Sequence, residues 1–223
     1  MALLFAWWFT RSQIKVDAAR LADVPGMDNE RVITAYALAR SLADSKVLKP
    51  SEVAGLMAIA YKESRFDARV RSPDAAPDAA VGHSWGLFQF TAPTLETLGI
   101  SLADITPVAN RDGTVSTAEL VRTARGSAAG ALKFLAYKPG WTGGRSYLEA
   151  VRAKHPKDEA GVLRDIFVSW TAGASKTFDD IEDVAPNSTP GSMGYTHFAI
   201  RSKFDALPWF LWALHLTDKN PEG

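Results

Sequence analysis

The stretch SEVAGLMAIAYKESRFD, residues 51–67, decides the fold class because its apolar residues return every three or four positions. This spacing predicts a helix that starts after Pro50 with Ser51 as its N-cap. The apolar stripe consists of Val53, Leu56, Met57 and Ala60. Three residues further along, the stripe reaches Glu63, an acidic residue at the apolar edge of the helix and close to its end.

Helical periodicity dominates the rest of the chain as well. Apolar stripes predict a helix after an N-cap at Asp28 or Asn29, a second one from about Thr117, and a third one over residues 162–170. Alternation of apolar and polar residues is scarce, and the segment 71–84, rich in Pro and Asp, is predicted to be a loop. We therefore expect a mainly α domain with few or no strands.

Composition limits the classes of function. The chain of 223 residues suits a single domain, and its 25 basic and 25 acidic residues cancel, which gives no indication of nucleic-acid or anionic-membrane binding. The absence of cysteine excludes disulfides, thiol catalysis and cysteine-ligated zinc. The apolar run at residues 2–9 is too short to span a bilayer and lacks the basic start and cleavage site of a secretory signal. We expect no stable membrane insertion.

Both ends of the chain are aromatic. Four of the seven tryptophans lie there, at Trp7, Trp8, Trp209 and Trp212. We expect these aromatic segments to pack in the core. A helix that anchors at a membrane interface usually has a lysine-rich polar face, and the polar positions of these segments are not rich in lysine. We expect residues 1–50 and 205–223 to be helical flanks that pack on a core of about 51–204.

The segment 82–86, GHSWG, matches the G-x-S-x-G pattern of serine esterases, with Ser84 as nucleophile and His197 or His215 as the base. This nucleophile turn needs a buried strand that leads directly into the serine. The preceding residues, PDAAPDAAV, do not have the character of such a strand. A serine esterase is therefore kept as the alternative from a different class.

Glu63 has two interpretations. As a structural residue it would cap the helix end or pair with Lys62 or Arg65. As a functional residue it would be partly buried, and burial raises the pKa of a carboxyl so that it can act as a general acid near neutral pH.

Four motifs in the same order resemble the lytic transglycosylases of lysozyme-like fold. That family has Glu-Ser-x-Phe at a helix end, then Gly-Leu-Met-Gln with a following Pro/Thr segment, then Ala-Tyr-Asn-Ala-Gly, and then a tyrosine that opens the last core helix. The matching segments are Glu63–Phe66, Gly86–Gln89 with the threonine in FTAPTLETLG, Ser169–Gly173, and Tyr195. The family's Tyr-Asn is replaced here by Trp170-Thr171, and His83-Ser84 stands where Gly-Ala is common.

The resemblance implies a lysozyme-like domain with a substrate groove that binds peptidoglycan glycan strands. Glu63 would be the sole catalytic acid and base, cleaving the bond between N-acetylmuramic acid and N-acetylglucosamine and leaving a 1,6-anhydro-muramic end without a cofactor. The expected substrate-binding residues are Ser64, Gly86, Phe88, Gln89, Trp170, Thr171 and Tyr195.

Two further alternatives share this architecture. A goose-type lysozyme would hydrolyse the same bond with a water positioned by Asp74 or Asp78, and a module without activity would only bind the wall. In each case we expect a monomer that acts on the cell wall, in the periplasm or outside the cell. Without a clear signal peptide, delivery by phage lysis or by a virion is a plausible route, and a bacterial enzyme is the alternative.

The segment 104–120 is predicted to be an insertion that resembles a degenerate calcium loop of the EF-hand type. The low-probability calcium ligands are Asn110, Asp112, Thr114, Ser116 and Glu119. Val108 stands at the first position, where an aspartate is usual. We therefore expect no metal, and a loop kept for its Asp112-Gly113 turn and for a capping box from Ser116 to Glu119.

Overall fold

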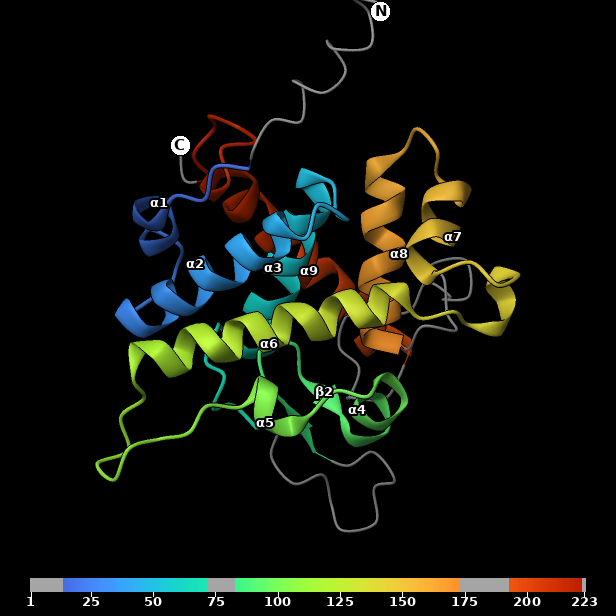
Figure 1. Ribbon diagram of the computed structural model, residues 1–223. Helices are drawn as coiled ribbons and strands as arrows, with labels where there is room; N and C mark the ends of the chain where they lie inside the picture. Colours follow the sequence, from blue (N-terminus) through green and yellow to red (C-terminus); the bar gives the residue numbers. More distant parts are fainter. Residues whose placement is uncertain (1–13, 72–82, 173–192, 222–223) are drawn as a thin grey trace, which may run out of the picture.

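The computed structural model describes residues 14–71, 83–172 and 193–221, and within them the protein is mainly helical (Figure 1). A single antiparallel pair forms the sheet there, with β1 (Ser84–Trp85) against β2 (Phe90–Thr91). The helices are α1 (Ala18–Ala22), α2 (Asn29–Asp44), α3 (Pro50–Ser64), α4 (Ala92–Leu98), α5 (Leu102–Ile105), α6 (Thr117–Ala136), η1 (Gly140–Thr142), α7 (Tyr147–Lys154), α8 (Glu159–Ala172) and α9 (Met193–Ala213). The prediction of a mainly α chain with few strands is confirmed.

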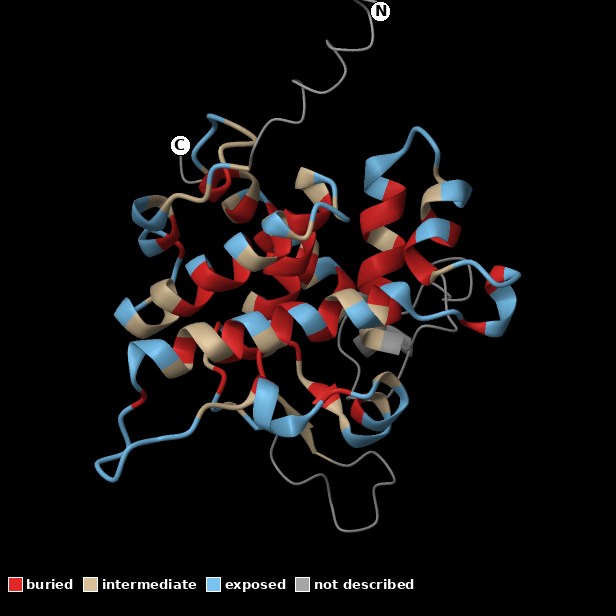
Figure 2. Ribbon diagram, in the orientation of Figure 1, coloured by how far each residue is buried: buried red, intermediate tan, exposed pale blue. Residues whose placement is uncertain are grey.

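The helix α3 lies at the centre of the structure. Every residue from Glu52 to Ala60 is buried, and α2, α8 and α9 pack around it (Figure 2). A helix buried on all its faces needs apolar or small residues all round, and the stretch VAGLMAIA supplies them. The predicted stripe was therefore too narrow. The predicted N-cap was also wrong, since the helix begins at Pro50, where the missing N–H costs nothing, and Lys49 is the cap.

The long helix α6 separates two parts of the molecule (Figure 1). On one side it packs against α2, and on the other side it contacts α4 and α5. The hairpin of β1 and β2 lies on the same side as α4, which begins directly after β2. The segment between α5 and α6 projects away from the body and is largely exposed (Figure 2).

The short helix α5 is held between two glycines. A Cβ atom at Gly126 of α6 would lie 2.0 Å from the carbonyl oxygen of Asp104, and one at Gly86 would lie 2.9 Å from the carbonyl oxygen of Ile105. Both obstacles are backbone atoms, which cannot rotate away as a side chain can. The small size of these two residues therefore fixes how closely α5 approaches both α6 and the turn after β1.

We expect Gly126→Ala to destabilise the protein. The helix propensity of alanine contributes about 1 kcal/mol, whereas overpacking costs about 1–3 kcal/mol. The free energy of unfolding, measured by urea denaturation, should fall. Arg125→Ala, at the exposed neighbouring position, is the control and should change it by less than about 0.5 kcal/mol. A Gly126→Ala variant that is more stable than the wild type would contradict the close contact.

The two ends of the described chain are joined. Asp17 caps α1, and its second carboxylate oxygen lies 2.9 Å from Nε2 of His215, just beyond α9. Arg20 donates to the carbonyl oxygen of Trp212 at 2.7 Å and lies over its ring. Trp209 packs edge-on against Trp212, as expected for core packing, whereas Trp7 and Trp8 lie outside the described residues. No helix within the described ranges is long and apolar enough to cross a membrane.

We expect Asp17→Asn to lower stability at neutral pH and to have no such effect in acid. Hydrogen bonds from His215 and from the backbone N–H of Arg20 lower the pKa of Asp17. A carboxyl with a lowered pKa stabilises the folded state above its unfolded pKa of about 3.9, and this contribution is lost as the pH falls through the folded value. Unfolding curves of the variant and the wild type should therefore differ at pH 7 and converge as the pH falls through the lowered pKa of folded Asp17. Curves that stay equally far apart at both pH values would contradict the role of the charge.

Candidate functional site

The first two motifs meet through Ser64, the last residue of α3. Its buried hydroxyl lies 2.9 Å from the carbonyl oxygen of Ala60 and 3.0 Å from that of Leu87. The single hydroxyl hydrogen is shared between the two carbonyls, one in the preceding helical turn and one in the turn 86–89. Ser64 therefore fastens this turn to the end of α3, and its donor is already used inside the protein.

Gln89 holds the turn from within. The backbone is left-handed at Gly86, with a φ of 74°, and also at Gln89, with a φ of 50°. The amide nitrogen of Gln89 donates to the carbonyl oxygens of Val70 and Gly86 at 3.0 and 2.8 Å, and its Oε1 accepts the hydroxyl of Ser84 at 2.9 Å. Both amide hydrogens are therefore engaged, and only a lone pair of Oε1 is left for a sugar hydroxyl or amide.

The same contacts bear on the esterase alternative. Ser84 lies in β1, opposite Thr91 of β2, and its hydroxyl donates to Gln89. Ser84 and Trp85 of this motif thus form one strand of an antiparallel hairpin, whereas a nucleophile turn joins a strand to a helix. The local geometry favours the interpretation of Gly86–Gln89 as a structured turn beside Glu63.

Trp170, near the end of α8, packs against the same turn. Its indole nitrogen donates to the carbonyl oxygen of Phe88 at 3.1 Å, and its ring lies 5.0 Å from that of Phe88 and 4.5 Å from that of Phe134. The side chain of Phe88 is only 1% exposed. Phe88 was predicted to bind substrate, and the structure places its ring in the core, so that only its backbone lies toward the turn's surface contacts. Trp170 is half-buried and packs against these neighbours.

The backbone is strained just beyond the end of α3. Arg65 and Phe66 both have left-handed φ angles, of 52° and 60°, and neither is a glycine. Such a conformation costs about 1–3 kcal/mol per residue and persists only where the surroundings impose it. Here Phe66 is buried and its ring packs against those of Tyr61 and Phe210. The motif Glu-Ser-x-Phe thus ends α3 by turning Phe66 back into the core.

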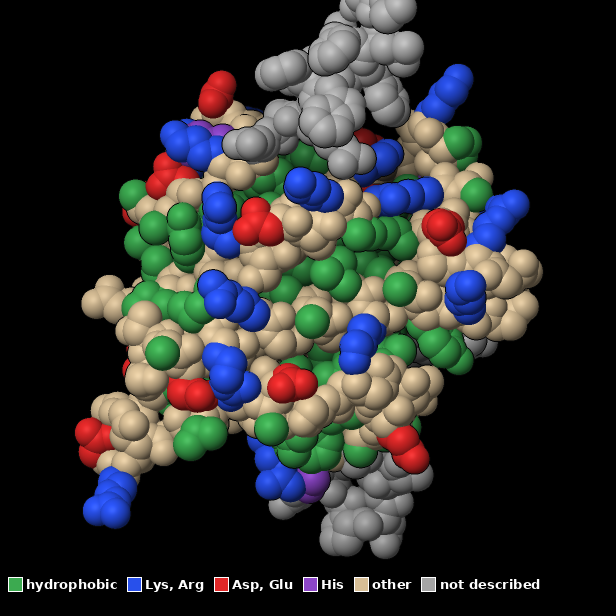
Figure 3. All heavy atoms as spheres, viewed as in Figure 1, with side chains coloured by type: hydrophobic (Ala, Val, Ile, Leu, Met, Phe, Trp, Pro, Cys, Tyr) green, Lys and Arg blue, Asp and Glu red, His purple; other side chains and the backbone are tan. Residues whose placement is uncertain are grey.

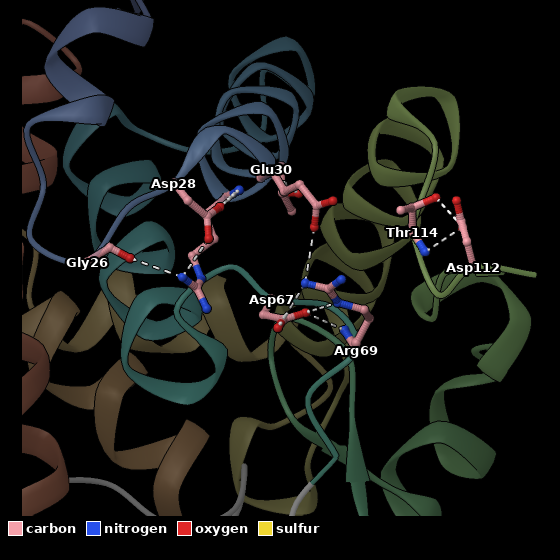
Figure 4. A network of polar contacts seen from close by, with 9 residues as sticks. Gly26, Asp28, Glu30, Asp67, Arg69, Asp112 and Thr114 are labelled. Atoms are coloured by element: carbon pink, nitrogen blue, oxygen red, sulfur yellow. Dashed lines mark hydrogen bonds and ion pairs between the residues drawn. The ribbon is translucent and has the colours of Figure 1, made fainter. Parts of the chain in front are cut away.

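An arginine fixes the segment that follows (Figure 4). Nε of Arg69 bonds to Asp67 at 2.9 Å, and its terminal nitrogen lies 3.1 Å from Glu30 of α2. The hydrogen bond with Asp67 and the nearby charge of Glu30 raise the pKa of Arg69, so it is always charged. This contact joins the chain after Glu63 to the start of α2.

Glu63 lies where α3 leaves the core, and 28% of its side chain is exposed. Its Oε1 lies 2.9 Å from Nζ of Lys203 in α9, and the same ammonium donates to Oγ1 of Thr171 at 3.0 Å. The side chain of Lys203 is 2% exposed. Lys62 and Arg65 were predicted as partners, whereas Lys203, which lies 140 positions from Glu63, was not. The available signal was that Lys203 stands at helical spacing from the apolar residues Ile200, Ala206 and Leu207.

The structure thus brings together Glu63, Ser64, Gly86–Gln89, Trp170 and Thr171. Tyr195 lies in the first turn of α9, and its side chain is outside the described part of the chain, as is that of His197. Asp74 and Asp78, the carboxylates of the hydrolytic alternative, also lie outside the described residues.

The oxygens of the segment 108–119 are engaged in internal contacts. Asp112 accepts the N–H and the hydroxyl of Thr114, and Glu119 accepts from Arg122 and from the N–H of Val108. The hydrogen bond from Arg122 lowers the pKa of Glu119. Half of the predicted capping box forms, since Ser116 accepts the N–H of Glu119 at 3.2 Å. Over residues 14–71, 83–172 and 193–221, no group of three or more acidic or histidine residues could hold a metal ion.

Comparison with protein-family models, with curated proteins and with solved structures finds no match for this chain.

We expect Trp170→Phe to lower the free energy of unfolding by about 1–3 kcal/mol, because phenylalanine keeps an aromatic ring but leaves the carbonyl of Phe88 without its donor. Urea denaturation measures the change. Trp141→Phe, at a ring that is 42% exposed, is the matched control and should cost less. Equal losses in the two variants would show that the indole N–H does not hold the turn.

Proposed function

We propose that the protein is a peptidoglycan lytic transglycosylase with a lysozyme-like domain and with Glu63 as its catalytic acid and base. The observation that carries this proposal is the convergence of three of the four resembling motifs around Glu63. Ser64 bonds to Leu87, Trp170 bonds to Phe88, and Lys203 of α9 joins Thr171 to Glu63. The motifs 63–66, 86–89 and 169–173 are thus connected by direct contacts or through Lys203, and the side chain of the fourth, Tyr195, lies outside the described part of the chain.

The surroundings of Glu63 suit a mechanism with one carboxylate. Hydrolytic glycosidases usually place two carboxyl groups about 5–9.5 Å apart, the second one serving as nucleophile or as base for a water. In the described part of the chain, the charged group in contact with Glu63 is a lysine and not a second carboxylate. A transglycosylase needs no second carboxylate, because the substrate supplies its own nucleophile.

The proposed reaction has two proton transfers. Glu63 first donates a proton to the oxygen that leaves as the bond to the anomeric carbon of the muramyl residue breaks, while the N-acetyl oxygen of the substrate supports the positive charge. The resulting carboxylate then takes the proton of the muramyl 6-hydroxyl, whose oxygen bonds to the anomeric carbon. Glu63 ends protonated, as it began, and no water is consumed.

Hydrolysis of the same bond by a goose-type arrangement is the second candidate. It needs a carboxylate to position a water, and Asp74 and Asp78 in the loop before β1 are the side chains proposed for it. The products separate the two, because hydrolysis leaves a reducing muramic end that is one water heavier than the anhydro end. For either reaction we propose a monomer that acts on glycan strands of the wall without a cofactor and reaches them by phage lysis or in a virion.

We expect Glu63→Gln to be folded and inactive. Glutamine keeps the shape of the side chain but transfers no proton, and loss of general acid–base catalysis costs about 10²–10⁴-fold in rate. The rate of muropeptide release from purified peptidoglycan should fall by at least that range, with an unchanged circular dichroism spectrum. The products of the wild type, analysed by mass spectrometry, should end in 1,6-anhydro-muramic acid.

The matched control is Glu159→Gln, at an exposed glutamate that pairs only loosely with Lys49 at 3.7 Å. A surface pair of this kind contributes little, so this variant should retain its activity. Full activity in Glu63→Gln would refute the mechanism, and reducing muramic ends from the wild type would replace transglycosylation by hydrolysis.

A further inference from the structure

Lys203 is an ammonium group enclosed between two acceptors. Its Nζ lies 2.9 Å from Oε1 of Glu63 and 3.0 Å from Oγ1 of Thr171. The hydroxyl of Thr171 donates its only hydrogen to the carbonyl oxygen of Phe167 at 2.9 Å, so toward Lys203 it can only accept. The direction of every hydrogen in this chain of contacts is therefore fixed, with Lys203 as the donor to both neighbours.

Stability by itself does not explain this arrangement. An ion taken out of water loses its hydration, and replacing a buried ion pair by apolar side chains of similar volume is often neutral or stabilising. The surroundings of Lys203 on α9 are apolar, with Ile200, Ala206 and Leu207 all buried. A methionine or leucine at position 203 would suit such a site. The chain instead has a lysine there, which pairs with the carboxylate of Glu63 at the end of α3.

The contact also distinguishes the two oxygens of Glu63. Lys203 binds Oε1, and the side chain emerges from the core with 28% of its surface exposed. The side chain of Lys203 is 2% exposed, and among the described residues its contact on the exposed side of the site is Glu63. Lys203 can therefore act on a reaction at this site through the carboxylate alone.

We propose that Lys203 is the positioning residue of the catalytic carboxylate. It holds Oε1 so that Oε2 is the atom that exchanges protons with the glycan, and its charge stabilises the carboxylate that remains once the leaving oxygen has been protonated. Thr171 accepts a hydrogen bond from the ammonium of Lys203 and so helps to position the carboxylate of Glu63, and it does not contact the sugar. This inference rests on the proposed transglycosylase function.

The test measures release of anhydro-muropeptides from purified peptidoglycan at several concentrations of substrate, so that kcat and KM are separated. Lys203→Met keeps the length of the side chain and removes its charge, and a misplaced catalytic group costs up to about 10²-fold in rate. We expect kcat to fall by about 10–100-fold, with KM changed by less than about twofold, because the glycan does not contact Lys203. The control is Lys62→Met, at the exposed lysine next to Glu63 in α3, which should keep the kcat of the wild type.

A second pair of variants tests the anchor without removing the charge. Thr171→Val keeps the shape of threonine but removes the acceptor, whereas Thr171→Ser keeps the hydroxyl. We expect kcat to fall about tenfold in Thr171→Val and by less in Thr171→Ser. The two variants should differ in kcat by more than any difference in their thermal unfolding temperatures would explain. This pair also gives a result if Lys203→Met does not fold.

The outcomes separate the two proposals. Release of anhydro products by the wild type, together with an unchanged kcat in folded Lys203→Met or equal kcat values in the two Thr171 variants, would overturn the positioning role and leave the transglycosylase function in place. A wild-type protein that releases no glycan fragments would overturn the proposed function and the positioning role with it.

Discussion

Burial of α3 from Glu52 to Ala60 is the constraint on which the rest of the structure depends. A helix surrounded by α2, α8 and α9 can carry a charged group only at its two ends, and both ends do so. At the first turn, Glu52 is buried and pairs with Arg152 of α7. At the last turn, Glu63 emerges from the core and meets Lys203 of α9. The position of the candidate acid therefore follows from where the helix stops being enclosed.

The side chains of the resembling motifs bind mainly to backbone groups of the protein. Ser64 and Trp170 each donate to a carbonyl of the turn 86–89, and Gln89 donates to two carbonyls around it. Together they fix a left-handed turn beside Glu63, and Ile105 lies close to the turn at Gly86. These residues would then serve catalysis by forming a rigid turn next to Glu63. This agrees with the general requirement that a reactive group be held within a fraction of an ångström.

Strain and charge are both concentrated at the end of α3. Arg65 and Phe66 have left-handed backbones, and the ring of Phe66 packs against that of Phe210. Arg69 then forms an ion pair with Glu30 of α2 (Figure 4). The charged side chains on the face shown in Figure 3 are, in contrast, spread as single lysines, arginines and acidic residues among apolar atoms. The pair of Glu63 and Lys203 differs from these, because the side chain of Lys203 is only 2% exposed.

Local periodicity by itself determined the helical class, the start of α2 after Asp28, the start of α6 after Ser116, and the place of Glu63 at a helix end, because these depend on neighbours three or four residues away. The resemblance to the lytic transglycosylases, and not periodicity, singled out the residues that meet in the turn 86–89, but it did not show what they do there. Phe88 was expected to face sugar and is buried, since its exposure depends on α8, and Gln89 was expected to bind substrate and has its amide hydrogens in the turn. Lys203 was not found at all. Only the tertiary structure brings α9 against the end of α3, because the pairing of two charges 140 residues apart leaves no periodic trace in the sequence.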